Sequence, residues 1–366
     1  MATLGYIGCK HRLLGAVDEV LRKNVHADRL PGCVLLDLFS GTAAVGTFAN
    51  RTYKCRVLAT DCEAFAETIA RATLTCPYTP KLAALVDAMN ALPPEDGPLA
   101  LELSEKRMFF TPENGRILQA ARSFVDRLTP AELDGPERAF LVASILSSAD
   151  RVANTASVYG SYLKHYKTVA KRRLSIAPVH TSADVPHAAT NVVCCADANA
   201  FVERDLAGLL ERIASEPSTS VAAANGTVVA FVDCPYNHRN YSSYYSPLNV
   251  IAKNDTHNLR GIGAMMPDGY SSDFSSKRRA LAAFRRLVQG LVAVRAVDHV
   301  FVTYGLYGIM TEDDITTALA QFGTVKKYGV GVKKFVSDTG VDAGTVAERW
   351  FFVTRSQDIG SSGSTM

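Results

Sequence analysis

The sequence predicts a doubly wound α/β fold, in which the strands of one sheet alternate with helices that cover both of its faces. Short apolar runs recur along the chain, and each has the near-continuous Val, Leu and Phe content of a strand buried on both faces. Amphipathic helical patterns separate several of these runs. With 366 residues, of which 48% are hydrophobic and 20% charged, the chain can form one large domain or two modest ones.

Six runs are strand candidates, and most end in an acidic or small residue. They are "VLLDLF" (34–39), "RVLATD" (56–61), "VVCCAD" (192–197), "VVAFVD" (228–233), "HVFVTYG" (299–305) and "RWFFVTR" (349–355). Helical patterns are predicted over residues 42–52, 64–74 and 279–294. Ligands of such sheets bind at the carboxyl ends of the strands, where Asp37, Asp61, Asp197 and Asp233 fall.

About a hundred residues between the second and third runs have a different sequence pattern. Residues 113–128 and 137–153 place apolar side chains at helical spacing, and a basic, tyrosine-bearing stretch, "YGSYLKHYKTVAKRR" (159–173), follows them. We therefore expect a discontinuous domain made of residues 1–90 and 190–356. Residues 91–189 form a helical insert in this division, and residues 357–366 form a disordered tail.

The bulk composition excludes some classes of protein and leaves others open. A formal charge of +3 permits a nucleic-acid partner without requiring one. Lysine and arginine occur by residues 10–12 with no apolar run before them, and no later run approaches the roughly 20 residues of a membrane span. The eight cysteines form no CxxC pair, so we expect reduced thiols in an intracellular protein and no metal site.

The stretch "DLFSGTAAVG" (37–46) joins the end of a strand to a glycine-containing turn and a helix. Such a turn lets the backbone approach a ligand, and the helix N-terminus favours an anionic group. Asp61, at the end of the next strand, is suited to both hydroxyls of a ribose, and Asp197 to an adenine amino group. Each aspartate is equally compatible with a helix N-cap. Because position 43 is alanine, the GxGxxG fingerprint is missing, which favours a nucleoside ligand without a pyrophosphate over NAD.

The stretch "DCPYN" follows the run 228–232 and resembles the [DNS]PP[YFW] motif of methyltransferases that modify exocyclic amino groups of bases. "YIGCKHRLL" (6–14) resembles the N-terminal Y-x-G-[GS]-K-x-x-L-L element of the Dam-like adenine methylases, and "DLFSGTAAVG" resembles their D-x-F-x-G-x-G loop. "FFTPENGRI", "SADRVANTASVYGSYLK" and "ERWFFVTR" are also similar to segments of these enzymes. The resemblance runs from residue 6 to about residue 355, in the motif order of the alpha group.

This resemblance implies a Rossmann-like methyltransferase sheet, mixed and mostly parallel, with a helical target-recognition insert. The implied activity is site-specific DNA adenine-N6 methylation, in which the methyl group of S-adenosylmethionine moves to an adenine flipped out of duplex DNA. In the catalytic motif Asp233, Cys234, Pro235 and Tyr236, the Asp233 side chain and the carbonyl of residue 234 accept from the amino group, and Tyr236 stacks on the base. The implied cofactor-binding residues are Tyr6, Gly8, Lys10, Asp37, Phe39, Ser40, Gly41, Thr42, Asp61, Asp197 and Asp233.

The sequence departs from the family pattern at two positions. Ala43 replaces the second glycine of the loop, which weakens cofactor binding if the backbone there needs a positive φ. Cys234 replaces the first proline of the catalytic motif. A cysteine nucleophile belongs to cytosine methylation, where the order is Pro-Cys. In this sequence the cysteine lies between the aspartate and the proline, so we expect it to contribute only its carbonyl.

Candidate DNA contacts lie in the insert and after the catalytic motif. The resemblance implies that Asn154 and Tyr159 take part in target recognition. Basic side chains are candidate phosphate contacts, although each is also typical of a solvated helix face; they are Lys164, Lys167, Lys171, Arg172, Arg173, Arg239, Lys277 and Arg278. The loop 237–245 is suited either to closing over a flipped base or to packing its tyrosines.

Two other functions remain open at this stage. The first is methylation of a base amino group in RNA, since some RNA methylases carry a similar motif. The second is an inactive module that binds S-adenosylmethionine or DNA, which only Ala43 and Cys234 support. For the leading function we expect duplex DNA as partner, optionally with a cognate restriction endonuclease, and a monomer or weak dimer. The expected location is the cytoplasm or nucleoid, or a host cell if the protein is encoded by a virus.

Overall fold

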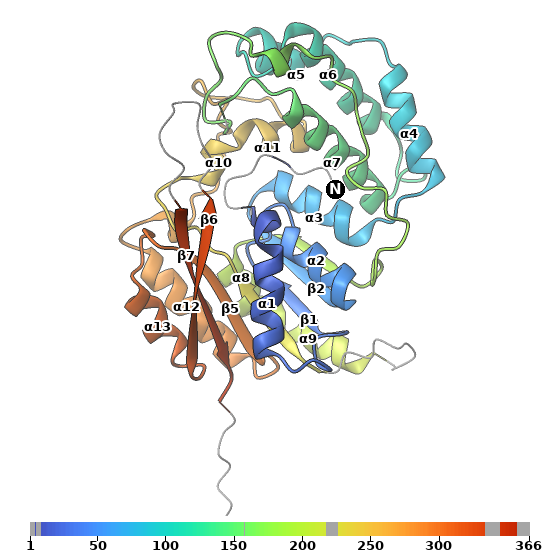
Figure 1. Ribbon diagram of the computed structural model, residues 1–366. Coiled ribbons are helices and arrows are strands. Elements are labelled where there is room, and N and C mark those ends of the chain that lie inside the picture. The colour runs from blue at the N-terminus through green and yellow to red at the C-terminus, as the bar shows by residue number, and fades with distance from the viewer. Residues whose placement is uncertain (1–3, 5–8, 157, 217–225, 334–344, 357–366) are drawn as a thin grey trace, which may run out of the picture.

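A computed structural model describes residue 4 and residues 9–156, 158–216, 226–333 and 345–356 (Figure 1). Two features expected from the sequence lie outside these residues. They are the candidate cofactor-binding residues Tyr6 and Gly8, and the tail 357–366.

Seven strands of the described chain form one sheet, in the order β3-β2-β1-β4-β5-β7-β6. The first five are parallel, whereas β7 runs antiparallel to both of its neighbours. The strands are β1 (Val34–Asp37), β2 (Arg56–Asp61), β3 (Val192–Cys195), β4 (Val228–Val232), β5 (His299–Gly305), β6 (Val325–Lys333) and β7 (Thr345–Thr354). The predicted mixed, mostly parallel methyltransferase sheet is therefore confirmed.

Strand β6 is not among the strands that the sequence predicts. It lies at the edge of the sheet and pairs with β7. Its sequence, "VKKYGVGVK", lacks the continuous apolar run by which the central strands are recognised. Lysines are common on edge strands because they discourage pairing with a further chain.

Helices cover both faces of the sheet, which explains why its central strands are apolar on both sides. The side chain of Leu35 packs in one core with α1 and α2, and that of Leu36 packs in the opposite core with α8, α12 and α13. The helices of the first face are α1 (Leu14–Asn24) and α2 (Ala44–Tyr53). Those of the second are α8 (Ala198–Arg204), α9 (Leu206–Ser215), α12 (Ala280–Ala293) and α13 (Glu312–Leu319).

A separate group of helices forms the upper part of the molecule in Figure 1. It contains α4 (Pro80–Ala91), α5 (Pro98–Ala100), α6 (Pro112–Arg127), α7 (Gly135–Arg151), α10 (Tyr241–Tyr244) and α11 (Ser246–Lys253). Helices α6 and α7 correspond to the two helices predicted in the insert. Helix α7 begins with a capping box formed by Asp134 and Glu137, which satisfies backbone N–H groups of its first turn.

Helix α3 (Ala64–Thr75) connects the helical group to the sheet. Ala70 and Leu74 belong to the core that the sheet shares with α1 and α2. Phe65 and Ile69 belong to the core of the helical group. None of the helices described combines the length and apolarity that crossing a bilayer requires. The carboxyl ends of β1 and β4, which are neighbours, mark the point where the strand order reverses, and this is where ligands of such sheets bind.

Candidate active site

Two hollows meet at the carboxyl ends of β1 and β4. The larger encloses about 710 Å³, part of it open to solvent, and Asp61, Asp197 and Tyr236 contribute to its wall. The smaller encloses about 290 Å³ and is lined by Lys10, Asp37 and the turn 40–42, among others. Phe39 and Asp233 line both hollows. Candidate residues from five separate segments of the sequence are therefore gathered around one site.

The turn after β1 has the left-handed backbone that the glycine pattern requires. Gly41 has a φ of 49° and Ala43 a φ of 53°, and the Ala43 N–H donates to the Ser40 carbonyl over 2.6 Å. A left-handed conformation costs an L-residue about 1–2 kcal/mol, so Ala43 carries a strain that glycine would avoid. Its methyl group is buried in the core shared with α1 and α2, which offsets part of this cost. Position 43 thus adopts a positive φ although it is occupied by alanine.

Asp37 lies at the base of the smaller hollow and is fully buried. One of its oxygens accepts the Gly46 N–H over 2.9 Å. Burial raises the pKa of Asp37 to about 7, and the nearby carboxylates of Asp233 and Asp61 add to the effect. Three carboxyl groups around one site make it unfavourable for another anion and favourable for a ligand that carries positive charge.

Asp233 is held by two side chains that are distant in the sequence. The Lys10 ammonium lies 2.9 Å from Asp233 Oδ1, and the Thr303 hydroxyl donates to the same oxygen over 2.7 Å. No donor from the described part of the chain binds Asp233 Oδ2. One carboxylate oxygen is therefore fixed, and the other is left to accept a hydrogen bond from a ligand.

Lys10 is only 4% exposed and also lies 3.4 Å from Glu348 Oε1, while the other oxygen of Glu348 accepts from the indole of Trp350. Burial alone would lower the pKa of Lys10, but Asp233 and Glu348 together raise it above its ordinary value. Burial raises the pKa of Asp233, and Lys10 opposes that rise. The ammonium is thus the main group that keeps Asp233 ionised.

Cys234 is 1% exposed and packs in the core shared with α12 and α13. Burial raises the pKa of its thiol above the ordinary range, and the neighbouring Asp233 carboxylate adds to this rise. Because the thiolate is the nucleophilic form, this environment suppresses the reactivity of the sulfur.

Replacement of Cys234 by serine is expected to leave methyl transfer active. Stability should fall by about 1–3 kcal/mol, because a hydroxyl enters an apolar core. Cys234→Pro is likewise expected to remain active, since the carbonyl is retained. Rates measured with labelled methyl donor, together with thermal unfolding, test both. A folded but inactive Cys234→Ser protein would restore the cysteine as a nucleophile.

Tyr236 forms part of the wall of the larger hollow. Its carbonyl accepts the Ile309 N–H over 2.9 Å, and its ring packs edge-on against Tyr304 with centroids 5.9 Å apart. A Cβ atom at Gly305 would lie 2.8 Å from the Tyr236 ring, so only glycine allows this approach. Gly305, at the end of β5, therefore allows the Tyr236 ring to pack closely in the wall that it shares with Asp233.

Asp61 and Asp197 both line the larger hollow, but with different internal partners. Asp61 accepts the N–H groups of Gly41 (2.8 Å) and Glu63 (3.0 Å), and burial raises its pKa. Asp197 caps α8 by accepting the Ala200 N–H over 3.0 Å, and the Tyr270 hydroxyl donates to its second oxygen over 2.6 Å. Asp197 thus has the N-cap role that the sequence left open, without being removed from the cavity wall.

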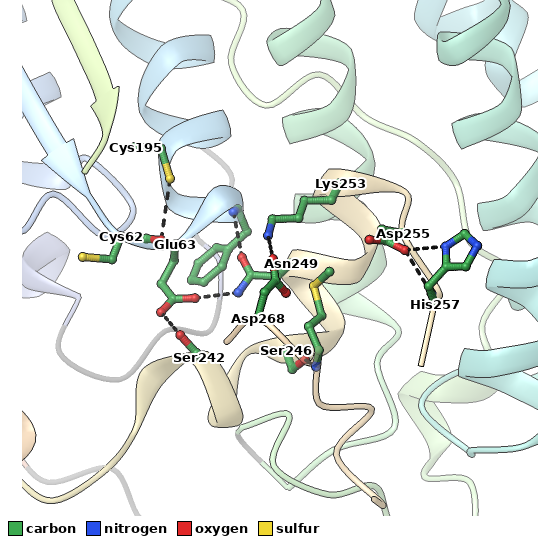
Figure 2. Close-up of polar contacts among 12 residues, drawn as sticks. Cys62, Glu63, Cys195, Ser242, Ser246, Asn249, Lys253, Asp255, His257 and Asp268 are labelled. Carbon is green, nitrogen blue, oxygen red and sulfur yellow. Dashed lines mark hydrogen bonds and ion pairs between the residues drawn. The ribbon is translucent and has the colours of Figure 1, made fainter. Parts of the chain in front are cut away.

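Glu63 is a buried acid in this wall that the sequence does not single out. Figure 2 shows its carboxylate between two residues of α10 and α11: the Ser242 hydroxyl and the Asn249 amide each donate to one oxygen over 2.5 Å. The side-chain oxygen of Asn249, Oδ1, accepts the Phe65 N–H at the start of α3 at a distance of 3.1 Å. These bonds fasten the segment after the catalytic motif to the turn after β2.

Asn154 and Tyr159, which the resemblance assigns to target recognition, are both buried in this structure rather than at its surface. Asn154 is 0% exposed; its amide donates to the carbonyls of Met108 and Leu163, and its side-chain oxygen accepts the Lys167 N–H. Tyr159 is 1% exposed and donates to Asp150 over 2.8 Å. Both side chains shape the loop 154–167 from within.

The basic side chains proposed as phosphate contacts differ in how exposed they are. Lys167 is half-buried and donates to the Thr155 carbonyl over 2.7 Å, and Arg173 pairs with Glu113 at the surface. The exposed candidates also include Lys164, Lys171, Arg172, Arg239, Lys277 and Arg278.

The segment after the catalytic motif brings some of these candidates together. The Arg239 guanidinium lies 5.6 Å from the centre of the Tyr244 ring, and the Arg239 carbonyl accepts the Ser275 hydroxyl over 3.1 Å. The Tyr244 carbonyl accepts the Tyr159 N–H over 2.9 Å. The insert, the loop 237–245 and the stretch that leads to Lys277 therefore meet beside the larger hollow.

Thr303, Glu348, Glu63 and Tyr270 are site residues that sequence reasoning missed. Thr303 lies within a predicted strand and Glu348 directly before another, but nothing in a strand pattern marks which polar residue faces a distant aspartate. Within the described residues, no group of three or more His, Cys, Asp or Glu side chains is arranged to hold a metal ion.

Comparison with known proteins gives a consistent set of similarities. A family model described as D12 class N6 adenine-specific DNA methyltransferase matches residues 6–206. Type II methyltransferase M.CviAII of Paramecium bursaria Chlorella virus 1 is 28% identical over 361 residues, which cover 96% of this chain and 99% of that protein. Type II methyltransferase M.NlaIII of Neisseria lactamica is 27% identical over 342 residues, covering 92% and 93%.

Modification methylase StsI of Streptococcus sanguinis is 25% identical over 368 residues, which cover 96% of this chain but 52% of that protein. No solved structure matches the chain significantly.

Proposed function

Because the chain belongs to the family of D12 class N6 adenine-specific DNA methyltransferases, we propose that it transfers the methyl group of S-adenosylmethionine to the N6 amino group of an adenine flipped out of duplex DNA. The observation that carries this proposal is the fixation of Asp233. Lys10 and Thr303 occupy one oxygen and leave the other available, on the wall shared by the two hollows.

The residues around the hollows fit S-adenosylmethionine. Its ribose would bind Asp61, and its methionine end would lie near Asp37 and the turn 40–42. The Ser40 hydroxyl is buried there without a hydrogen-bond partner among the described residues, and it lines the smaller hollow. The carboxylates around the site favour the positive sulfonium. When bound, this cofactor supplies a methyl group that is already a good electrophile.

The chain's own residues would activate the adenine. The amino nitrogen is a weak nucleophile because its lone pair is delocalised into the ring. Asp233 Oδ2 and the carbonyl of Cys234 would each accept a hydrogen bond from one of its two N–H groups. They would thereby favour the geometry in which the lone pair is available, an interaction that strengthens in the transition state. Tyr236 would stack on the base, a contact worth about 1–3 kcal/mol.

Exposed basic side chains near the cavity would bind the DNA backbone. Arg239 and the stretch that carries Lys277 and Arg278 meet beside the larger hollow, and Lys164 lies in the adjoining loop of the insert. Phosphate contacts of this kind make affinity fall as salt rises. The enzyme would act as a monomer or weak dimer.

The relatives are named as type II methyltransferases and a modification methylase. We therefore propose that this enzyme protects a specific sequence within a restriction-modification system, alongside a cognate endonuclease.

Incubation with tritiated S-adenosylmethionine and duplex DNA, single-stranded DNA or RNA tests the activity. Label is expected in duplex DNA, on N6 of adenine. Label restricted to RNA would contradict the proposed substrate, and no label in any of them would favour an inactive binding module. Sequencing of methylated adenine in the DNA of the expression host then identifies the recognised site.

A further inference from the structure

We propose that Glu63 is a positioning residue that couples binding of the methyl donor at Asp61 to placement of the segment 240–249, which follows the catalytic motif. This inference rests on the proposed function, in that Asp61 is taken as the ribose-binding carboxylate. It concerns a residue to which neither the motifs nor the reaction assigns a role.

Glu63 is connected to the cofactor side of the cavity through its backbone. Its N–H donates to Asp61 Oδ1 over 3.0 Å, while Asp61 Oδ2 accepts the Gly41 N–H over 2.8 Å. Asp61 thus links the glycine turn after β1 to the turn that carries Glu63. A ligand that donates hydroxyl groups to Asp61 restrains this carboxylate and, through it, the backbone at Glu63.

Glu63 is connected to the target side through its carboxylate. Its two oxygens accept from Ser242 on α10 and from Asn249 on α11. Asn240 caps α10 by accepting the Ser243 N–H, so α10 and Asn240 are held as one unit. Asn240 and Tyr241 line the larger hollow together with Asp233 and Tyr236. The position of this part of the wall therefore depends on Glu63.

The choice of an acid at this position is not explained by stability alone. Glu63 is 5% exposed, and none of its hydrogen-bond partners is a cation. Lys253, whose charge lowers the pKa of Glu63, pairs instead with Asp268 (Figure 2). A buried carboxylate without a cationic partner is costly, whereas two acceptor oxygens on one side chain are what two separate donors require. The cost is consistent with a role in joining two binding regions.

The test measures the coupling between the two ligands in the full-length protein. The affinity for a duplex carrying the mapped site is measured by fluorescence anisotropy, with and without saturating S-adenosylhomocysteine. Calorimetry gives the affinity for S-adenosylhomocysteine with and without the duplex. In the wild type, each ligand is expected to tighten binding of the other by the same factor, in the range of about 5- to 150-fold.

In Glu63→Ala this factor is expected to fall to about one, while the affinity for S-adenosylhomocysteine alone stays near the wild-type value. Ser242→Ala, which removes one of the two bonds, should give an intermediate factor and guards against misfolding of the first variant. Glu63→Gln should retain most of the coupling, because its amide can accept from Asn249 and donate to Ser242. Glu67→Ala, which breaks a surface pair with Arg71 on the same helix, is the matched control and should leave the factor unchanged.

Two results would overturn the inference. One is an unchanged coupling factor in Glu63→Ala. The other is loss of both binary affinities and of thermal stability with the factor preserved, which would show a purely structural role. Failure of the wild type to bind S-adenosylhomocysteine at all would instead count against the proposed function, so the two failures are distinguishable.

Discussion

Replacement of Asp233 by alanine is expected to lower the rate of methyl transfer by about 10²- to 10³-fold or more. In the proposed mechanism, Asp233 Oδ2 accepts a hydrogen bond from the adenine amino group, and that bond strengthens as the nitrogen becomes pyramidal. The affinity for S-adenosylhomocysteine should stay close to that of the wild type, because Asp61, the proposed ribose-binding carboxylate, is untouched. Single-turnover kinetics and calorimetry measure the two effects separately.

Asp233→Asn is the matched control for this experiment. The amide keeps the size of the side chain and can still accept through its oxygen, but it lacks the negative charge that pairs with Lys10. We expect a smaller loss of activity than in Asp233→Ala and a similar fold by circular dichroism. Full activity in Asp233→Ala would contradict the mechanism directly.

Replacement of Lys10 by methionine is expected to move the acidic limb of the pH–rate profile upward by about 1–3 pH units. Asp233 must be ionised to accept from the amino group, and it loses activity when it is protonated as pH falls. Lys10 holds its pKa down, so removing the ammonium raises that pKa and inactivates the enzyme at a higher pH. The variant should therefore lose activity at a higher pH than the wild type and recover as the pH is raised. Values of kcat at saturating donor and DNA, over about pH 6 to 9, measure the shift.

Glu348→Gln is a control in which the pKa of Asp233 is expected to shift in the opposite direction. The Glu348 carboxylate raises the pKa of Asp233, so its neutralisation should move the acidic limb downward. The glutamine oxygen can still accept from Trp350, which preserves the local packing. If Lys10→Met lost activity equally at every pH, Lys10 would act on the cofactor or on folding rather than through Asp233.

The fold was largely predictable because its signals are local. A strand covered on both faces needs a continuous apolar run, and β2 and β5 have the predicted limits. The missed strand β6 carries lysines and glycines because it is an edge, where burial does not dictate the sequence. The predicted helix ends shifted by one or two residues, since caps such as Asp134 set the ends and a periodic pattern does not.

The candidate site was predictable only in part. Asp37, Asp61, Asp197 and Asp233 lie where the strand ends put them, because parallel strands bring their carboxyl ends to one edge. Asn154 and Tyr159 were assigned to DNA from motif resemblance, but whether a polar side chain is exposed depends on which element covers it. In this chain the loop 154–167 closes over both.

By itself, then, the sequence determined the class of fold, the strand ends that carry carboxylates, and the catalytic motif, because these depend on periodicity and on residues adjacent in the chain. Only the tertiary structure decided that Lys10 and Thr303 share one oxygen of Asp233, and that Glu63 joins the two sides of the cavity. These pairs come from separate segments. Pairing of β4 with β5 brings Thr303 to Asp233, the N-terminal segment places Lys10 beside the same oxygen, and packing of the helical group against the turn after β2 brings Ser242 to Glu63.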